Sequence, residues 1–473
     1  GGILQLSHMT FDPLLRWTKD LGFEPRLAES WTRVDENTMR FKLREGVKFH
    51  SGNELTTADV KFTFDRLKQS QDFKAIFKPF SGINIIDDYT FELVTSEPYP
   101  LLLNTATYIF PFDSEFYSGQ TEDGKDKSAI LKHGNSFASE NLSGTGPYTV
   151  TERKQGVRVE FERFDDYWDT ESPGNVGKIV LTPIKENNTR VSALLSGGVD
   201  FIAPVPPNDL ERIRNDKNAN LVTMRGTRII LFHMNQERVE AFKNPKVRQA
   251  IAYAINQEGI AAKIMKGFAT PAAQMSPEGY QGYNESLTPR FDVAKAQELM
   301  KEAGYEDGFT ITMMAPNNRY VNDDKIAQAV AAMLARINIK VDLKTLPKAQ
   351  YWPEYDNRAA DMMMIGWHAD TEDSANFYEF LTFCPDADTG AGQYNAGNYC
   401  NPEIDALVQK ANVETDLDKR AAMLQEVEQR LYDDAAFVPL HWQDLAWASK
   451  KNVNIEPVLN VMNFPYLGDL VVE

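Results

Sequence analysis

The second half of the chain alternates helical patterns with single short strands. Apolar residues recur at helical spacing from Ile326 to Ile337, and the alternating run 339–343 follows directly. An earlier helix pattern begins at Pro245, and residues 407–431 form a later one. Helices that alternate with single strands are typical of folds in which helices cover a sheet. The sequence therefore predicts an α/β lobe here.

The first third of the chain is richer in strands. In the segment 37–49, apolar Met39, Phe41 and Leu43 alternate with basic residues, which indicates a half-buried strand. A further strand at 157–161 follows a turn-forming Gly-Thr-Gly-Pro segment. We also expect a helix over 58–67 capped by Thr56 or Thr57, and a hairpin over 83–94 that turns at Asp87 and Asp88.

Charge and missing motifs exclude several classes of function. The chain carries 68 acidic and 50 basic residues, a net charge of −18, and no basic cluster, so we expect no nucleic-acid partner. The histidines closest in sequence, His8 and His50, are 42 residues apart, so no helical histidine pair for a metal exists. Sequence signatures of serine hydrolases, nucleotide-binding loops and dinucleotide-binding loops are also missing. We expect no metal, no cofactor and no catalysed reaction.

The chain has two cysteines, Cys384 and Cys400, at the two ends of one polar, glycine-rich segment. This arrangement is typical of a disulfide that closes a loop in an oxidising compartment. Two unrelated thiols are the alternative.

Several segments resemble the family 5 extracellular solute-binding proteins of ABC importers, which include dipeptide-, oligopeptide- and nickel-binding proteins. The resemblance covers essentially the whole chain. It is carried by Leu27–Trp31 with Phe41–Gly52 and Thr57–Val60, by Gly144–Tyr148, by Tyr167-Trp168, by Asn244–Ile251, and by Asp292–Ala296 with Leu299 and Ala303-Gly304.

The resemblance implies an α/β fold of two lobes, the type II periplasmic-binding-protein fold of the large cluster C, with an extra subdomain on the first lobe. It assigns 1–235 and 440–473 to the first lobe, 18–175 to the extra subdomain and 236–439 to the second lobe. Family members begin with a strand before the residues that match Gly1. We therefore expect that strand and a signal peptide to precede the numbered chain, and a periplasmic location.

The resemblance also points to ligand-binding residues. Gly366–Asp370 is similar to a segment in which peptide-binding members place a Trp and an Asp, so Trp367 would form an apolar wall and Asp370 would pair with a peptide ammonium. Asp370 as the cap of a helix over 374–381, and Trp367 as a core residue, are the alternatives.

Arg319 and Tyr320 lie in a segment similar to one that carries an arginine for the ligand carboxylate, although the spacing differs by one residue. A surface role or an interlobe salt bridge is the alternative for Arg319. Further candidates are Arg228 ahead of a strand, His368 beside Trp367, and the aromatic Tyr108, with Asp373 and Asn376 as weaker ones.

These observations predict a monomeric periplasmic receptor that captures a short peptide in an interlobe cleft and hands it to an ABC permease. Other ligands stay open within the class: a nickel chelate, haem, an opine, glutathione or an oligosaccharide. An enzyme on the same fold, and a chaperone-like or signalling protein, are the alternatives outside it.

Overall fold

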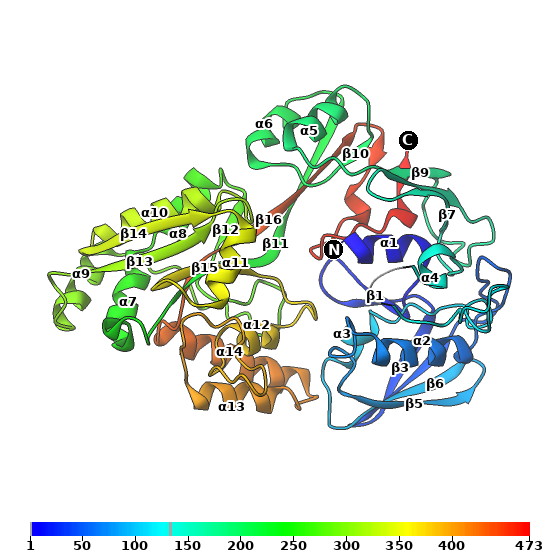
Figure 1. The fold of residues 1–473 in the computed structure, drawn as a ribbon, viewed down its shortest axis with the longest axis horizontal. Helices are drawn as coiled ribbons and strands as arrows, with labels where there is room; N and C mark the ends of the chain where they lie inside the picture. Colours follow the sequence, from blue (N-terminus) through cyan, green and yellow to red (C-terminus); the bar gives the residue numbers. More distant parts are fainter. Residues whose placement is uncertain (1, 132–134) are drawn as a thin grey trace. The chain divides into compact units, whose positions relative to one another are not determined.

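The computed structural model describes residues 2–131 and 135–473, and the chain forms two compact units (Figure 1). Unit 1 comprises Gly1–Val205, Asp209–Val222 and Ala446–Glu473, and unit 2 comprises Pro206–Asn208 and Thr223–Leu445. The lobe boundaries expected near residues 235 and 440, and the extra subdomain 18–175, stay predictions.

Unit 1 contains a four-stranded antiparallel sheet in the order β3-β4-β6-β5, with helix α2 packed beside it. A three-stranded sheet, β7-β8-β9, and two strand pairs, β1-β2 and β17-β18, complete its sheets among the described residues. Its elements are α1 (Gly2–Thr10), β1 (Leu15–Trp17), β2 (Phe23–Pro25), β3 (Ala28–Asp35), β4 (Thr38–Leu43), α2 (Thr57–Gln69), β5 (Phe80–Asp87), β6 (Thr90–Thr95), α3 (Leu102–Ala106), α4 (Phe137–Glu140), β7 (Tyr148–Lys154), β8 (Arg158–Arg163), β9 (Lys178–Leu181), α5 (Asn187–Leu195), β10 (Phe201–Ile202), α6 (Leu210–Arg214), β17 (Val453–Asn454) and β18 (Val471–Val472).

The alternation seen in the sequence explains strand β4. Met39, Phe41 and Leu43 are buried, whereas the intervening Arg40 and Lys42 are exposed. Side chains of a strand point alternately to the two faces of a sheet, so β4 places its apolar side chains in the core of unit 1 and its cations in solvent. The expected strand is confirmed, and so is the hairpin of β5 and β6.

Helix α2 begins with a capping box. The Thr56 hydroxyl accepts a hydrogen bond from the backbone N–H of Ala58, and the Asp59 carboxylate accepts one from the backbone N–H of Thr56 at 2.8 Å. These bonds satisfy donors that the first helical turn leaves unpaired. Thr56, rather than Thr57, is therefore the cap.

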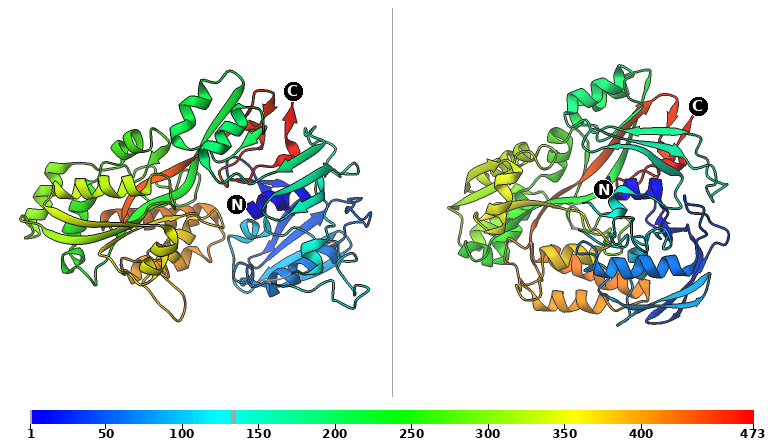
Figure 2. Two further views of the ribbon diagram at one scale, coloured as in Figure 1. Left: turned by 45° about the horizontal axis from the view of Figure 1, so that its top comes forward. Right: turned by 45° about the vertical axis from the view of Figure 1, so that its right-hand side comes forward.

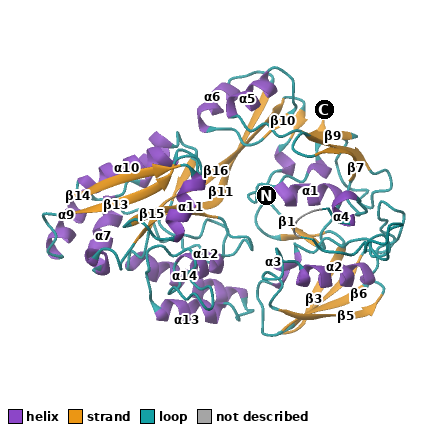
Figure 3. Ribbon diagram, in the orientation of Figure 1, coloured by secondary structure: helices purple, strands orange, loops and turns teal. Residues whose placement is uncertain are grey.

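Unit 2 is an α/β unit around most of a seven-stranded sheet. The strand order is β10-β16-β11-β15-β13-β14, and β12 also pairs with β16. Figure 3 shows the strands of unit 2 in orange, with helices beside them. The elements are β11 (Ala219–Met234), α7 (Pro245–Ala254), α8 (Gln257–Gly259), β12 (Ala269–Pro271), α9 (Val293–Glu302), β13 (Phe309–Pro316), α10 (Asp323–Ala335), β14 (Ile339–Leu346), α11 (Lys348–Asp356), β15 (Met362–Trp367), α12 (Ser374–Leu381), α13 (Pro402–Ala411), α14 (Leu417–Asp433) and β16 (Val438–Lys450).

The two longest strands, β11 and β16, each run from one unit into the other. They are neighbours in the sheet and lie side by side in both views of Figure 2. Within unit 2, the main core lies on the sheet face that α7, α9 and α10 cover, and it includes Ile230, Met364 and Leu440. The α/β architecture expected for this part of the chain is confirmed.

One expected element differs. Residues 407–431 read as one helical stretch, but the structure has two helices, α13 and α14. Helix α13 ends at Ala411, and the side chain of Asp416 accepts hydrogen bonds from the backbone N–H groups of Asp418 and Lys419, which starts α14. The cap therefore interrupts the helical pattern.

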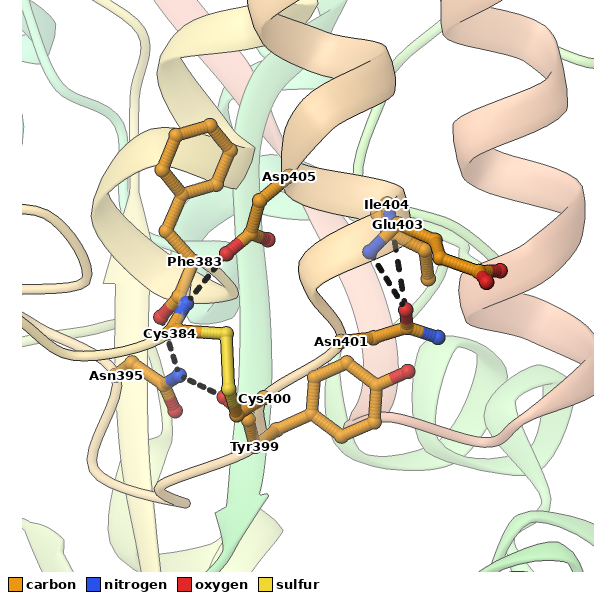
Figure 4. The surroundings of a disulfide bond; sticks show 9 residues. All are labelled: Phe383, Cys384, Asn395, Tyr399, Cys400, Asn401, Glu403, Ile404 and Asp405. Carbon is orange, nitrogen blue, oxygen red and sulfur yellow. Dashed lines mark hydrogen bonds between the residues drawn. A yellow bond between two sulfur atoms is a disulfide. The ribbon is translucent and has the colours of Figure 1, made fainter.

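The predicted disulfide between Cys384 and Cys400 is present in the structure (Figure 4). It joins the loop after α12 to the residue that precedes Asn401, the N-cap of α13. The Asn395 side-chain amide donates to the carbonyl groups of Phe383 and Tyr399, at 3.0 and 2.9 Å. The bridge and this amide thus close the same loop.

No helix among residues 2–131 and 135–473 combines the length and the apolar character that crossing a membrane requires.

Candidate functional site

Two strand ends of unit 2 lie at one edge of its sheet, next to the middle of the long strand β11. β13 and β15 are parallel, with Met313 beside Met362, so their carboxyl ends point the same way. β11 is antiparallel to β15, with Ile229 opposite Trp367, so Arg228 lies at that same edge. The expectation that Arg228 precedes a strand is wrong, because β11 already begins at Ala219. This edge, which we call the site edge, carries six of the expected ligand-binding residues: Arg228, Arg319, Tyr320, Trp367, His368 and Asp370.

Two arginines give the site edge a positive character. Arg228 is half-buried and Arg319 is exposed. Burial lowers the pKa of Arg228 and the nearby charge of Arg319 lowers it further, while Tyr320 and Asp370 act in the opposite direction. Within the described part of the chain, neither guanidinium has a carboxylate within the 4.0 Å of a salt bridge. Two close cations without such a partner favour an anionic ligand group.

Tyr320 lies beneath Arg319. The Arg319 guanidinium lies 4.7 Å from the centroid of the Tyr320 ring, a cation–π contact. Tyr320 itself is buried, and its hydroxyl donates a hydrogen bond to the Gly366 carbonyl at 3.2 Å. The Asp323 carboxylate accepts hydrogen bonds from the backbone N–H groups of Arg319 and Tyr320, both at 2.9 Å. The start of α10 thus orders the segment that carries the arginine.

Asp370 is exposed, and it lies close enough to Arg228 to raise that residue's pKa. Its carboxylate is therefore not a buried charge that requires a cation to offset the loss of solvation. The alternative role as a helix cap is wrong, because Asp373 is the N-cap of α12 and accepts a hydrogen bond from the Ala375 N–H at 3.0 Å. The ammonium-binding role of Asp370 stays a prediction.

Trp367 ends strand β15 and is half-buried. Its indole N–H donates a hydrogen bond to the Asn376 side chain at 2.8 Å, and its ring lies 5.0 Å from the rings of Phe380 and Tyr394. The polar atom of the indole is thus committed within unit 2. Trp367 can offer a ligand only its remaining apolar surface.

The polar atoms of His368 also have hydrogen-bond or ion-pair partners within unit 2. Its Nδ1 lies 2.8 Å from the Thr227 hydroxyl, and its Nε2 lies 2.9 Å from the Glu372 carboxylate. Both ring nitrogens therefore have partners inside unit 2, so the imidazole can meet a ligand only through its carbon edge or its face.

Glu372 was not among the residues predicted from the sequence. Its side chain is 3% exposed, and its carboxylate also accepts a hydrogen bond from the Tyr280 hydroxyl. The spacing of four residues between His368 and Glu372 was the one signal available. Tyr280 and Thr227 are distant in sequence, and only the fold brings them to this carboxylate.

Asp373, a weaker candidate for ligand binding, has a structural role. Its carboxylate lies 2.6 and 2.8 Å from the guanidinium nitrogens of Arg420, and both side chains are almost fully buried. Because this carboxylate also caps α12, both of its oxygens have partners inside unit 2.

Tyr108 lies in unit 1, where it is half-buried and packs against the core beside Phe73, with ring centroids 6.1 Å apart. The aromatic wall expected of it stays a prediction.

A serine and a glutamate meet elsewhere in unit 2. Ser276 Oγ lies 3.1 Å from the Glu428 carboxylate, which also accepts a hydrogen bond from Tyr378. Burial raises the pKa of Glu428 to about 7. Both residues are buried, at 0% and 1% exposure, so this pair is not open to a substrate. Within the described residues, no group of three or more His, Cys, Asp or Glu is placed to hold a metal ion.

The site edge therefore combines cations, one exposed carboxylate and an aromatic ring, and such groups are typical of a ligand-binding site.

A comparison with known protein families supports this interpretation of the site edge. Residues 22–389 match the bacterial extracellular solute-binding proteins, family 5, so the chain belongs to this family of substrate-binding proteins.

Curated relatives cover most of the chain. A glutathione-binding protein of Salmonella paratyphi A is 27% identical over 445 residues, which span 92% of this chain and 83% of that protein. The dipeptide-binding protein of Escherichia coli K12 is 28% identical over 441 residues, spanning 87% and 79%.

A solved structure, the periplasmic binding protein DppA of Helicobacter pylori in complex with the peptide STSA, has a TM-score of 0.76 at 24% identity. The structural alignment covers 100% of this chain and 94% of the Helicobacter pylori protein. The fold is thus the two-lobe periplasmic-binding-protein fold that the sequence predicts.

Proposed function

We propose that this solute-binding protein is the periplasmic receptor of an ABC importer, that it binds a short peptide by its two charged ends, and that it delivers the peptide to a membrane permease. Asp370 binds the ammonium group, and Arg319 binds the carboxylate. The observation that carries the proposal is the site edge itself, where two guanidiniums without a salt-bridge partner lie near an exposed carboxylate.

The relatives support a ligand of this kind. One is named for glutathione and the other for dipeptides. Both kinds of ligand carry an ammonium and at least one carboxylate. A site that binds the charged ends and makes few specific contacts with the side chains would accept both kinds of ligand.

The test of the ammonium site uses two dipeptides, Ala-Phe and its N-acetylated form. Calorimetry on the parent protein should show binding of Ala-Phe and rejection of the acetylated form. Asp370→Ala should weaken Ala-Phe about 30-fold or more, since truncating one partner of a charge pair is that costly when the pair is desolvated. Asp307→Ala, an exposed carboxylate of unit 2, makes the same change in net charge and should leave affinity unchanged.

The carboxylate site is tested in the same way with Ala-Phe and its C-terminal amide. Arg319→Ala should remove the parent's preference for the free carboxylate, whereas Arg336→Ala, another exposed arginine of unit 2, should keep it. Equal binding of all three peptides by the parent would overturn the peptide-end mechanism and favour the non-peptide ligands of this family.

The arginine pair favours glutathione as a second candidate ligand. Glutathione carries two carboxylates, and the site edge offers two guanidiniums. Arg228→Ala should then reduce affinity for glutathione more than affinity for Ala-Phe. An equal loss for the two ligands would assign both arginines to one carboxylate.

Closure of the two lobes on ligand binding stays a prediction from the family resemblance. Small-angle scattering should give a smaller radius of gyration with saturating ligand. Identical curves with and without a ligand whose binding calorimetry has confirmed would contradict it.

A further inference from the structure

A closed ring of side-chain contacts lies directly behind the segment that carries Trp367 and Asp370. Thr227 comes from β11, Tyr280 from the segment between β12 and α9, and His368 and Glu372 from the segment after β15. Three parts of unit 2 that are far apart in sequence are thus joined through one carboxylate, that of Glu372.

Each polar side chain of this ring has a partner within it. The Tyr280 hydroxyl donates to one oxygen of Glu372, and His368 Nε2 lies 2.9 Å from the other. The second imidazole nitrogen faces the Thr227 hydroxyl at 2.8 Å, and this hydroxyl also interacts with the Tyr280 phenol. Burial and the Glu372 carboxylate raise the pKa of Tyr280, so the phenol stays a donor. Glu372 is thus the acceptor at which both arms of the ring end.

The backbone of Glu372 adds a second observation. Its φ angle is +50°, in the left-handed region that residues other than glycine rarely adopt. Its N–H donates to the Ala369 carbonyl at 3.0 Å, which closes a turn with Asp370 and Thr371 at its centre. Such a conformation persists where surrounding contacts determine it, and here the buried side chain of Glu372 supplies them.

The next residue along the chain is fixed as well. Asp373 is held by Arg420 and by the start of α12. The turn that presents Asp370 is therefore anchored by His368 before it and by Glu372 and Asp373 after it, while Asp370 itself is exposed.

We propose that Glu372 is a positioning residue for ligand binding: through His368, Tyr280 and the turn 369–372 it holds Asp370 and Trp367 in the geometry that receives the ligand. The ligand role of Asp370 rests on the function proposed above, whereas the ordering of the turn does not. Glu372 itself is too deeply buried to contact a ligand.

The variants are Glu372→Ala, Glu372→Gln and Tyr280→Phe. Glu372→Gln keeps an acceptor for Tyr280 but loses the carboxylate that faces His368, so its effect should be the smaller one. The matched control is Asp434→Asn. Asp434 also accepts from a tyrosine, Tyr399 at 2.6 Å, and pairs with a cation, Arg248 at 2.8 Å, but it lies outside the site edge.

Two measurements separate the positioning role from the proposed function. Hydrogen exchange on the ligand-free protein should show faster exchange of the amides of residues 369–373 in the Glu372 variants, with no change in the control. Calorimetry with Ala-Phe should show about a tenfold loss of affinity for Glu372→Ala, which is the scale expected when a buried donor loses its acceptor. Asp434→Asn should bind as the parent does, even where it lowers the melting temperature.

Each outcome decides something. Unchanged exchange at 369–373 together with affinity within twofold of the parent overturns the positioning role. If Glu372→Ala does not fold, Glu372→Gln and Tyr280→Phe carry the same two criteria. If the parent itself binds no Ala-Phe, the proposed peptide function fails, and exchange alone decides whether Glu372 orders the turn.

Discussion

The hydroxyl of Tyr320 donates a hydrogen bond to the carbonyl of Gly366 at 3.2 Å, and the ring occupies the space in which a side chain on Gly366 would lie. A Cβ at this position would come within 2.6 Å of Tyr320 Cε1 and 2.7 Å of Ile230 Cδ1. Glycine therefore lets the ring approach strand β15 closely, and the same ring supports Arg319 at the site edge.

We expect Gly366→Ala to displace Tyr320 and to destabilise the protein by about 1–3 kcal/mol, the usual cost of overpacking a core. Urea unfolding measures this change. Because the ring supports Arg319, the variant should also lose part of the parent's preference for peptides with a free carboxylate. Gly82→Ala, at a position in β5 where a Cβ meets nothing within 4 Å, is the control and should change stability by less than about 0.5 kcal/mol. Equal stability of the Gly366 variant and the parent would show that Tyr320 can move without cost.

The disulfide between Cys384 and Cys400 should leave no free thiol in the unfolded, unreduced protein. Replacing both cysteines with serine should lower the unfolding free energy by about 3 kcal/mol, because the bridge restricts the unfolded chain. Adding a reductant should shift the parent's melting temperature but not that of the double-serine variant. Two thiols in the titration would contradict the bridge.

Asp373 pairs with Arg420 in the interior of unit 2, and replacing Asp373 should be among the more destabilising single substitutions in this unit. Asp373→Ala leaves the Arg420 guanidinium, which is 1% exposed, without its counter-ion, and we expect a loss of about 3–5 kcal/mol.

Asp373→Ser separates the two roles of this carboxylate, because serine keeps a cap for α12 but carries no charge. It should therefore be less damaging than Asp373→Ala by about 1 kcal/mol. A surface pair gives the reference: Lys243→Ala, which removes the exposed partner of Glu240, should cost less than about 1 kcal/mol. A similar small cost for Asp373→Ala would show that water replaces the lost carboxylate.

Local patterns in the sequence were sufficient to predict many of the helices and strands. The alternation around Phe41 predicted β4, and the alternating run 339–343 predicted most of β14. The failures are also local in origin. A single helix over 407–431 was wrong, because the cap at Asp416 overrides a continuous apolar pattern. Capping of α12 by Asp370 was wrong because Asp373, three residues later, has the position that the N-cap requires.

The candidate site could be predicted only in part. Residues at or just after strand ends, such as Trp367 and Arg319, can be assigned to one edge once the parallel pairing of β13 and β15 is assumed. The ring around Glu372 could not, because Tyr280 is 92 residues away in sequence and no local pattern links the two. The sequence also could not show that the polar atoms of Trp367 and His368 are already committed, since hydrogen-bond partners are set by tertiary packing.

The buried histidines should make stability fall in acid. His233 and His441 are both fully buried in unit 2, and burial lowers the pKa of each to about 3. Neither ring nitrogen of His441 has a hydrogen-bond partner in the described structure. Since the unfolded chain binds a proton near pH 6.5 and the folded one only near pH 3, stability decreases as the pH falls through this window. Glu428 has the opposite effect. Because burial raises its pKa from 4.5 to about 7 in the folded protein, the folded state loses stability as the pH rises through this range.

We expect His441→Leu to raise the melting temperature at pH 7, because it removes a buried imidazole without partners, and to raise it more at pH 4.5. At pH 4.5, two units below the histidine's ordinary pKa of about 6.5, the buried His441 lowers the free energy of unfolding by about 2–3 kcal/mol, since each pH unit contributes about 1.4 kcal/mol. Glu428→Gln should instead steepen the loss between pH 7 and pH 4.5, because it removes the compensating group. Melting curves of the two variants and the parent at both pH values decide the matter. An equal shift for His441→Leu at pH 7 and pH 4.5 would contradict the assignment of acid sensitivity to this buried imidazole.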